Sequence, residues 1–331
     1  MDCVSLDLGF GYTKARSAVR RVAFPSVVGE GRQLLETLGA GDPLDSIIVE
    51  VGPRRYFVGA LALRQSGLRY FSLAEQRARD ETSRIIALAA LGLVADGPCR
   101  VVSGLPVAWF FGQRGEFARF LEGEHTVRVG VGRGAVREKR VSVEAVKLVP
   151  QPLGSYLLRL YAEDSRPDAR FASETVGVVD IGFQTLDLLV VSRLEVIQPL
   201  SASTKSGVVQ AYRWLGDALR ERFGLVRELY EIDDVARQGY VMQGGRRHSI
   251  DDLLDTARDY LGQLIRADIA THWAGAGLDR VLVTGGGAYH VGDRLSLPGP
   301  VIEVLDNPAE ANVEGYARLG RRDATWTRAA T

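Results

Sequence analysis

A short pattern occurs twice, about half a chain length apart, and it constrains the fold more than any other feature of the sequence. Residues 4–14 read Val-Ser-Leu-Asp-Leu-Gly-Phe-Gly-Tyr-Thr-Lys, and residues 178–187 read Val-Val-Asp-Ile-Gly-Phe-Gln-Thr-Leu-Asp. Each segment begins with an apolar strand that ends in an aspartate. After the aspartate come one apolar residue, then Gly-Phe, and then polar residues. Both segments therefore predict a β-hairpin with a glycine at its turn.

Such hairpins suit the binding of a phosphate chain. Successive backbone N–H groups in a turn can form a nest for phosphate oxygens, and glycine lets the ligand approach closely. Asp7 and Asp180, at the two strand ends, would place a carboxylate beside the phosphates, where Mg²⁺ takes oxygen ligands. Two facing hairpins can hold a triphosphate from opposite sides, so we expect a cleft between two domains. For either hairpin alone, a plain glycine turn is the alternative.

A glycine-rich segment near the C-terminus fits the same ligand. The apolar residues 280–283 predict a strand, and residues 284–288 read Thr-Gly-Gly-Gly-Ala before a short helix. Residues without side chains let a base or ribose lie against the backbone, and the following helix start adds N–H donors. No Gly-x-x-x-x-Gly-Lys-Ser/Thr sequence is present, and no helix follows the glycines in 130–134, which we interpret as turn residues.

Length and charge narrow the functional classes. A chain of 331 residues is long enough for two domains, and no apolar segment reaches the ~20 residues of a membrane span. The first apolar strand is too short for a signal peptide, so we expect a cytoplasmic protein. Basic and acidic residues number 41 each, so we expect no direct binding to nucleic acid. The histidines and cysteines lack metal-ligand spacing.

Strand-like and helix-like segments alternate along the chain, which predicts an α/β fold. Amphipathic spacing predicts helices over residues 73–94 and 250–273, the second with Ser249 as its N-cap. We expect a connecting helix over residues 152–163 and a final helix over residues 307–320. Apolar runs predict strands at residues 4–8, 47–51, 100–102, 176–179, 186–191 and 280–283.

The three ligand-related elements, in this order, resemble the actin, sugar-kinase and heat-shock-chaperone superfamily. Residues 7–14 resemble its first phosphate motif, residues 180–187 its second and residues 284–288 its adenosine motif. The resemblance implies the α/β, actin-like (ribonuclease H-like) two-domain ATPase fold with a nucleotide cleft between the domains. Domain I would comprise residues 1–165 with a return helix in 307–331, and domain II residues 166–306.

Further segments resemble ParM-type plasmid segregation proteins and related archaeal actin-like proteins. Residues 149–154 lie where the family has its first connecting helix and a water-positioning Gln or Glu, and residues 307–316 resemble the second connector. Phe24-Pro25-Ser26 and Gly104-Leu105-Pro106 also resemble sequences of this branch.

The resemblance implies a role for individual residues. Asp7 and Asp180 would hold Mg²⁺ through its waters, and Gln151 would orient the attacking water, since an amide cannot act as a base. Lys14 would contact the β- and γ-phosphates, whereas Asp187 either lines the site or ends its hairpin. The nucleotide-binding residues would be Gly9, Gly11, Tyr12, Thr13, Lys14, Gly182, Gln184, Thr185, Lys205, Gly207, Gly285, Gly286, Gly287 and Tyr289.

The implied function is an ATPase that binds ATP or ADP with Mg²⁺ and couples hydrolysis to filament assembly, for plasmid segregation or cytoskeletal positioning. Its partners would be further copies of itself and a DNA-binding adaptor protein. The alternatives are a non-filamentous ATPase or nucleotide-gated binding module, and a small-molecule kinase, which would need a carboxylate base. Residues 321–328 are too few and too polar to hold the chain on a membrane.

Overall fold

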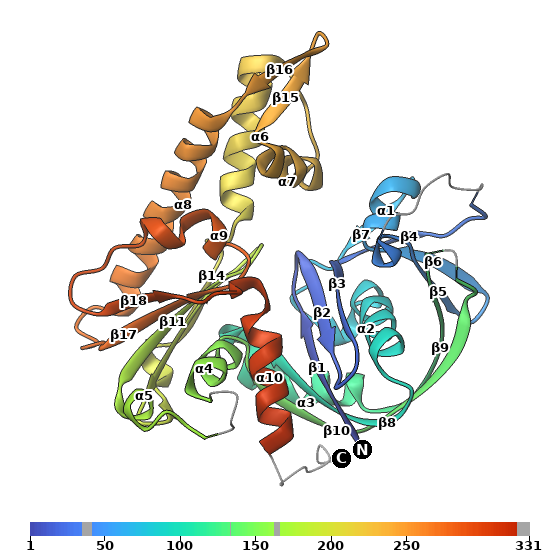
Figure 1. Cartoon of the computed structure of the whole chain (residues 1–331), viewed down its shortest axis with the longest axis horizontal. Helices are drawn as coiled ribbons and strands as arrows, with labels where there is room; N and C mark the ends of the chain where they lie inside the picture. The colour runs from blue at the N-terminus through green and yellow to red at the C-terminus, as the bar shows by residue number, and fades with distance from the viewer. Residues whose placement is uncertain (35–41, 133, 162–165, 323–331) are drawn as a thin grey trace. The chain divides into compact units, whose positions relative to one another are not determined.

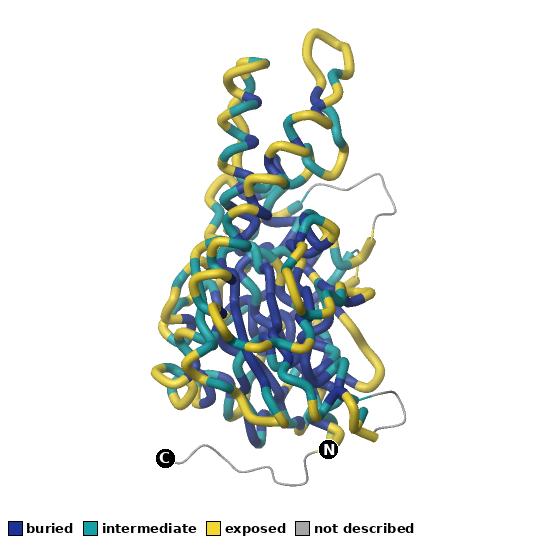
Figure 2. Tube along the Cα trace, turned by 90° about the vertical axis from the view of Figure 1, so that its left-hand side faces the viewer, coloured by how far each residue is buried: buried dark blue, intermediate teal, exposed yellow. Residues whose placement is uncertain are grey.

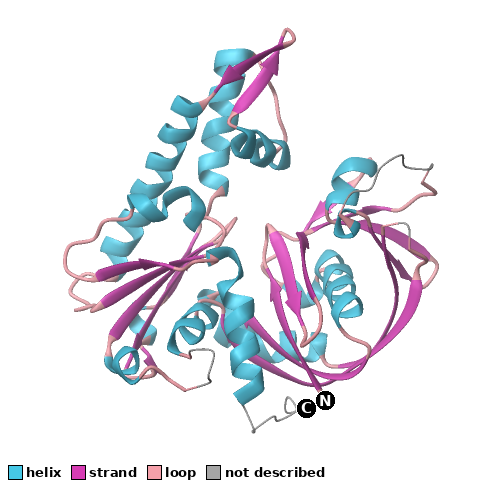
Figure 3. Cartoon of the chain, viewed as in Figure 1, coloured by secondary structure: helices cyan, strands magenta, loops and turns pink. Residues whose placement is uncertain are grey.

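The computed structural model describes residues 1–34, 42–132, 134–161 and 166–322 (Figure 1). The chain divides into two compact units: unit 1 is Met1–Ala169 with Glu310–Thr331, and unit 2 is Arg170–Ala309. The expected boundary at residue 165 and most of the polar tail at residues 321–328 lie outside the described residues. Each unit contains a sheet with helices packed on it, as Figure 3 shows, so the predicted α/β class is confirmed.

Unit 1 contains a large mixed sheet. Its strand order in the described part of the chain is β3-β2-β1-β8-β10-β9-β5-β6-β4-β7. β1 runs parallel to β8, and β8 runs parallel to β10, while the other neighbouring strands of this order are antiparallel. The strands are β1 (Asp2–Leu8), β2 (Tyr12–Arg16), β3 (Arg21–Pro25), β4 (Val27–Glu30), β5 (Ile47–Val51), β6 (Arg54–Val58), β7 (Arg69–Phe71), β8 (Gly97–Leu105), β9 (Gly123–Val131) and β10 (Arg137–Pro150).

Helices cover both faces of this sheet around its parallel strands. Val101 packs in one cluster with α2 (Glu81–Val94) and α3 (Val107–Leu121). The next residue, Val102, points to the opposite face, since side chains alternate along a strand. There it packs with Tyr316 of α10 (Ala311–Arg322) and near Leu153 of α4 (Leu153–Leu160). Shorter helices are α1 (Ala60–Gln65), η1 (Pro43–Asp45) and η2 (Arg77–Arg79), and η5 (Pro308–Glu310) lies at the boundary between the two units in the sequence.

The helix predicted over residues 73–94 begins later than expected. Its first residue is Glu81, because the side chain of Asp80 accepts a hydrogen bond from the backbone N–H of Ser83 (2.8 Å) and caps the helix start. The preceding residues form part of a loop that contains η2. The apolar spacing continues on the N-terminal side of Asp80, so the helix predicted from it began too early.

Unit 2 is built on a smaller sheet in the order β13-β12-β11-β17-β18, with β14 paired to β12. β17 is parallel to both β11 and β18, so the carboxyl ends of these three strands share one edge. The strands are β11 (Thr175–Ile181), β12 (Leu186–Ser192), β13 (Glu195–Val196), β14 (Ala202–Thr204), β17 (Arg280–Thr284) and β18 (Val301–Val304).

The helices of unit 2 pack on this sheet and on one another. α8 (Asp251–His272) confirms the helix predicted over residues 250–273, except that Ile250 rather than Ser249 is its N-cap. The hairpin of β15 (Tyr240–Gln243) and β16 (Arg246–Ser249) is largely exposed (Figure 2). The other helices are α5 (Ala169–Ser173), α6 (Val209–Phe223), α7 (Leu229–Gln238), α9 (Ala288–Val291), η3 (Gln198–Leu200) and η4 (Gly292–Arg294).

Helices α4 and α10 cross at very close range within unit 1. A Cβ atom built on Gly315 would overlap the backbone carbonyl of Gly154, so neither helix has room for a side chain at this point. Next to the crossing, the backbone N–H and the hydroxyl of Ser155 both donate to Oδ1 of Asn312, at 3.1 and 2.7 Å. The described part of the chain contains no helix with the length and apolarity of a membrane span.

We expect Gly315→Ala to destabilise the protein by about 2 kcal/mol, because the added methyl group forces α10 away from α4. Gly112→Ala is the matched control, since Gly112 is also helical and a Cβ there would meet no described atom within 4 Å. The control should gain up to about 1 kcal/mol from helix propensity. Urea unfolding followed by circular dichroism measures both changes, and an unchanged midpoint for Gly315→Ala would contradict the close crossing.

Candidate functional site

The parallel strands of unit 1 bring three chain segments to one edge of the sheet. Asp7 lies near the end of β1, Leu105 ends β8, and Gln151 directly follows β10. The backbone N–H of Gln151 donates to the carbonyl oxygen of Leu105 (2.8 Å), which fixes the start of the connection to α4. The carboxyl ends of parallel strands are where ligands bind in open α/β sheets.

The carboxylate of Asp7 lies at the centre of this group of residues in unit 1. It is buried, with 3% of its surface exposed. Lys14, its partner across the β1–β2 pairing, places Nζ 3.3 Å from Oδ2. Gln151 donates from Nε2 to Oδ1 at 3.1 Å. The structure thus brings together three residues that the sequence analysis assigned to phosphate, metal and water, although Gln151 lies 144 positions from Asp7.

Residues 7–14, which we call hairpin 1, contain the turn between β1 and β2, and Phe10 anchors this turn. Phe10 is buried. The guanidinium of Arg77 lies 4.2 Å from its ring centroid, and the ring of Trp109 meets it edge-on at 5.7 Å. Phe10 therefore packs into unit 1, which leaves the backbone of the turn as the group that can meet a ligand. Gly9 cannot carry a side chain, because a Cβ there would overlap the carbonyl of Tyr12.

Two neighbouring side chains on β2, those of Tyr12 and Thr13, differ in exposure. Tyr12 is 40% exposed, whereas Thr13 is completely buried. The hydroxyl of Thr13 lies 2.8 Å from the hydroxyl of Ser26, a residue of the Phe-Pro-Ser segment.

Unit 2 contains a second hairpin of the same design, hairpin 2 (residues 180–187). Asp180 lies near the end of β11 and is 4% exposed. It is paired with Asp187 on β12 and with Thr284 on β17. The N–H of Gly182 donates to the carbonyl of Thr185 (2.9 Å) and closes the turn. The predicted hairpins are thus both present, each with a buried aspartate near a strand end.

Asp187 has hydrogen-bond donors inside its own unit. Its carboxylate is 2% exposed and accepts from the hydroxyls of Thr185, at 2.9 Å, and Ser203. The side chain of Thr185, a predicted ligand contact, is therefore engaged within the hairpin. Ser203 was not singled out in the sequence, where it is one of several serines before a helix.

The start of α6 lies directly against hairpin 2. The N–H groups of Val208 and Val209 donate to the carbonyls of Gly182 (3.1 Å) and Phe183 (2.9 Å). Gly207 permits this approach, because a Cβ there would fall 2.5 Å from the Phe183 carbonyl oxygen. Lys205, two residues earlier, is exposed. The structure therefore places Gly207 beside the predicted phosphate turn.

The three glycines after β17 differ in their surroundings. Gly285 has φ +82° and donates from its N–H to the carbonyl of Pro308 (2.9 Å). A Cβ on Gly287 would overlap the side chain of Ile181, whereas a Cβ on Gly286 would meet no described atom within 4 Å. Gly285 and Gly287 are thus required for packing, while Gly286 leaves its backbone open. Tyr289, on α9, is 64% exposed.

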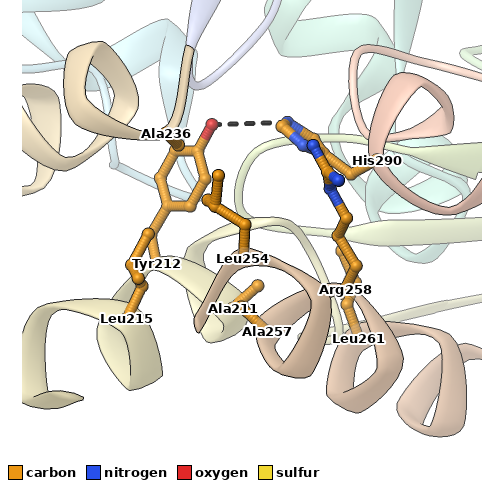
Figure 4. Close-up of a pocket in the computed structure, with 9 residues that line it drawn as sticks. All are labelled: Ala211, Tyr212, Leu215, Ala236, Leu254, Ala257, Arg258, Leu261 and His290. Carbon is orange, nitrogen blue, oxygen red and sulfur yellow. Dashed lines mark hydrogen bonds between the residues drawn. The ribbon is translucent and has the colours of Figure 1, made fainter. Parts of the chain in front are cut away.

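Figure 4 shows a small pocket between α6, α7, α8 and α9. Helix α9 directly follows residues 284–287, which we call the glycine segment. Tyr212 donates from its hydroxyl to Asp233 (2.6 Å), and the same oxygen lies 3.3 Å from Nε2 of His290. Burial lowers the pKa of His290, so its ring is neutral at physiological pH. No sequence motif indicated these residues, because they come together only through helix packing. The lining residues are Ala211, Tyr212, Leu215, Ala236, Leu254, Ala257, Arg258, Leu261 and His290.

The described residues contain no group of three or more His, Cys, Asp or Glu side chains that could enclose a metal ion. Asp7 in unit 1 and Asp180 in unit 2 each place one carboxylate beside a glycine turn. A single carboxylate of this kind is chemically suited to Mg²⁺, which usually keeps several waters and takes one or two carboxylates together with substrate phosphates.

Comparison with known proteins identifies both halves of the chain. Residues 5–154 match the family described as actin-like proteins, N-terminal domain, and residues 178–297 match the archaeal actin homologue MreB-like C-terminal family. No curated protein matches the chain at a significant level.

Solved structures share the fold over almost the whole chain. A 15-stranded ParM filament from Clostridium botulinum is similar with a TM-score of 0.79 and 23% identity, over 97% of this chain and 99% of that one. A non-polymerisable quadruple mutant of pCBH ParM gives 0.80 and 22%, with the same coverage. The archaeal actin homologue Ta0583 in complex with ADP gives 0.80 and 19%, over 98% and 100%. The chain thus contains an actin-like N-terminal domain and an archaeal actin-homologue, MreB-like C-terminal domain, and its fold is that of the ParM and Ta0583 structures.

Proposed function

We propose that this protein binds Mg-ATP through hairpin 1, hairpin 2 and the glycine segment, hydrolyses it, and couples the nucleotide state to assembly into filaments. The observation that carries the proposal is the repeated design of the two hairpins. In each unit a strand carries a buried aspartate near its carboxyl end, and a glycine turn follows it. The ADP complex of a protein with the same fold supports nucleotide as the ligand.

The phosphate chain would be bound mainly by backbone N–H groups, because Phe10 and Phe183 pack against residues of their own units. Phe10 lies against Arg77 and Trp109, and Phe183 meets the ring of Tyr212 edge-on at 6.3 Å. Lys14 adds a positive charge within hairpin 1, next to Asp7. The ribose and base would lie against Gly286, the exposed glycine of the segment. Nests of backbone N–H groups bind phosphate in this way in many proteins.

Asp7 and Asp180 would hold Mg²⁺ through its waters. When bound, the ion neutralises charge on the phosphate oxygens and so stabilises the developing charge of phosphoryl transfer. Lys14 already offsets the charge of Asp7 in this structure, because its Nζ lies 3.3 Å from Oδ2.

Gln151 would orient the water that attacks the γ-phosphate. A carboxylate only accepts hydrogen bonds, so the end of the amide that faces Asp7 must be Nε2. The amide oxygen is therefore the end turned away from Asp7, and it can accept a hydrogen bond from a water molecule. Phosphoryl transfer depends mainly on such positioning and on electrostatics rather than on covalent help from the protein.

Assembly into filaments is supported by the Clostridium botulinum ParM filament, which has the same fold. In such a mechanism ATP favours the conformation that assembles and hydrolysis releases it, which requires different nucleotide affinities in the two conformations. By analogy with the ParM proteins, the cellular role would be segregation of plasmid DNA through an adaptor protein.

Light scattering and pelleting over a protein concentration series test the assembly step. We expect a rise above a critical concentration with Mg-ATP, together with phosphate release, and no rise with Mg-ADP or with ATP and a chelator. Phosphate release without scattering would favour a non-filamentous ATPase. Phosphate transfer to a small-molecule hydroxyl instead of water would favour a kinase.

Asp180→Ala should reduce Mg-dependent phosphate release by at least ~100-fold, comparable to the loss of one group that stabilises a transition state. Asp168→Ala is the control. It also removes an aspartate, but Asp168 lies in unit 1 rather than in hairpin 2, and it forms a part-exposed ion pair with Arg159. Circular dichroism checks that both variants are folded. Undiminished turnover in a folded Asp180→Ala protein would remove Asp180 from the site.

Gln151→Ala should slow hydrolysis by ~10- to 100-fold while ATP affinity stays within about threefold, because the amide acts on the water and not on the nucleotide. Single-turnover hydrolysis and equilibrium binding of ATP separate the two effects. If the variant no longer binds ATP, the water-positioning role is wrong.

A further inference from the structure

The Phe24-Pro25-Ser26 segment has no role in the function described above, yet its serine contacts hairpin 1 at three positions. Ser26 lies between β3 and β4 and is 2% exposed. Its hydroxyl donates to the carbonyl oxygen of Gly9 at 2.7 Å, and its backbone N–H donates to the carbonyl oxygen of Gly11 at 2.9 Å. Its hydroxyl oxygen also lies 2.8 Å from that of Thr13.

The direction of these hydrogen bonds follows from counting protons. A carbonyl can only accept, so the single hydroxyl proton of Ser26 is given to Gly9. The proton between the two hydroxyls must then come from Thr13. The result is a chain from Thr13 through Ser26 to Gly9, and the hydroxyl proton of Thr13 is used inside the protein rather than at the phosphate.

The two carbonyl contacts determine where the N–H groups of the turn point. In a trans peptide the C=O and the following N–H point in opposite directions, and the described residues contain no cis peptide bond. Because the carbonyls of Gly9 and Gly11 face Ser26, the N–H groups of Phe10 and Tyr12 point away from it. If either peptide group flipped, its carbonyl oxygen would take the place of the N–H group and would repel phosphate oxygens.

Hairpin 2 receives equivalent support without a side chain. Its carbonyls at Gly182 and Phe183 accept from the backbone N–H groups of Val208 and Val209. No substitution short of proline removes those donors. In unit 1, by contrast, the hydroxyl of Ser26 is the group that holds the Gly9 carbonyl, so one substitution can release it.

We propose that Ser26 is a positioning residue that orients the peptide groups of hairpin 1 and thereby sets the affinity of the protein for the phosphate part of its nucleotide. The inference rests on the proposed binding of ATP. It assigns Thr13 to the same hydrogen-bond chain, as a support for Ser26 rather than as a direct phosphate ligand.

Ser26→Ala tests the proposal, with calorimetric titration of ATP and of adenosine as the two probes. We expect the ATP affinity to fall about tenfold, comparable to the loss of one buried hydrogen bond, and the adenosine affinity to stay within about twofold. Ser26→Thr retains the hydroxyl and should restore most of the ATP affinity. A merely structural role would not change the ratio of the two affinities.

Ser72→Ala is the matched control. Ser72 is also buried, at 1% exposed, and its hydroxyl bonds to the hydroxyl of Ser83 at 2.9 Å instead of to hairpin 1. It should lose similar stability but keep the ratio of ATP to adenosine affinity. A Ser26→Ala protein with an unchanged ratio, or with both affinities reduced equally, would overturn the proposal.

Two further outcomes are informative. If Ser26→Ala does not fold, Thr13→Val provides the test, because it removes only the outer hydroxyl of the chain and should lower the ATP-to-adenosine ratio by roughly threefold; an unchanged ratio would contradict the inference. If the wild-type protein binds no ATP, the proposed function fails and the inference fails with it. Wild-type binding with an unaltered Ser26→Ala ratio refutes the inference alone.

Discussion

The parallel pairing of β1 with β8 and of β8 with β10 is the arrangement on which the unit 1 site depends. It brings the ends of three strands to one edge, so that Asp7 and Gln151 can share a hydrogen bond. The parallel pairing of β11 with β17 does the same in unit 2, where Asp180 lies beside the strand that leads into the glycine segment. In both units, the aspartate lies where the parallel pairing of its strand ends: Asp7 follows the last β1–β8 pair, and Asp180 belongs to the last β11–β17 pair.

The two hairpins have the same design, but different groups hold their turns in place. Hairpin 2 rests on the backbone at the start of α6, which requires the absence of a side chain at Gly207. Hairpin 1 rests on the hydroxyl of Ser26 and on the packing of Phe10. Phe10 and Phe183 are therefore compatible with the proposed phosphate binding, since each side chain packs against residues of its own unit.

Much of the fold could be predicted from the sequence, because strands and glycine turns leave local patterns. The hairpins at Asp7 and Asp180 and the long helix α8 are examples. The predicted start of α2 was wrong because apolar spacing continued past the capping residue Asp80. Contacts between distant segments, such as Ser26 with Gly9, leave no periodic signal. The role of a serine in a buried turn became visible only when its hydrogen-bond partners were known.

Helix α10 comes from the far end of the chain, yet it completes unit 1. It covers the sheet face at Val102, and Glu314 within it and Glu310 just before it form ion pairs with Arg16 and Arg21 on the strands that follow hairpin 1. During synthesis, unit 2 can therefore emerge entirely before unit 1 is closed. A nascent chain without α10 would display the apolar sheet face at Val102 and would lack the ion pairs to Arg16 and Arg21, so quality-control factors could distinguish it from the chain in which α10 has docked.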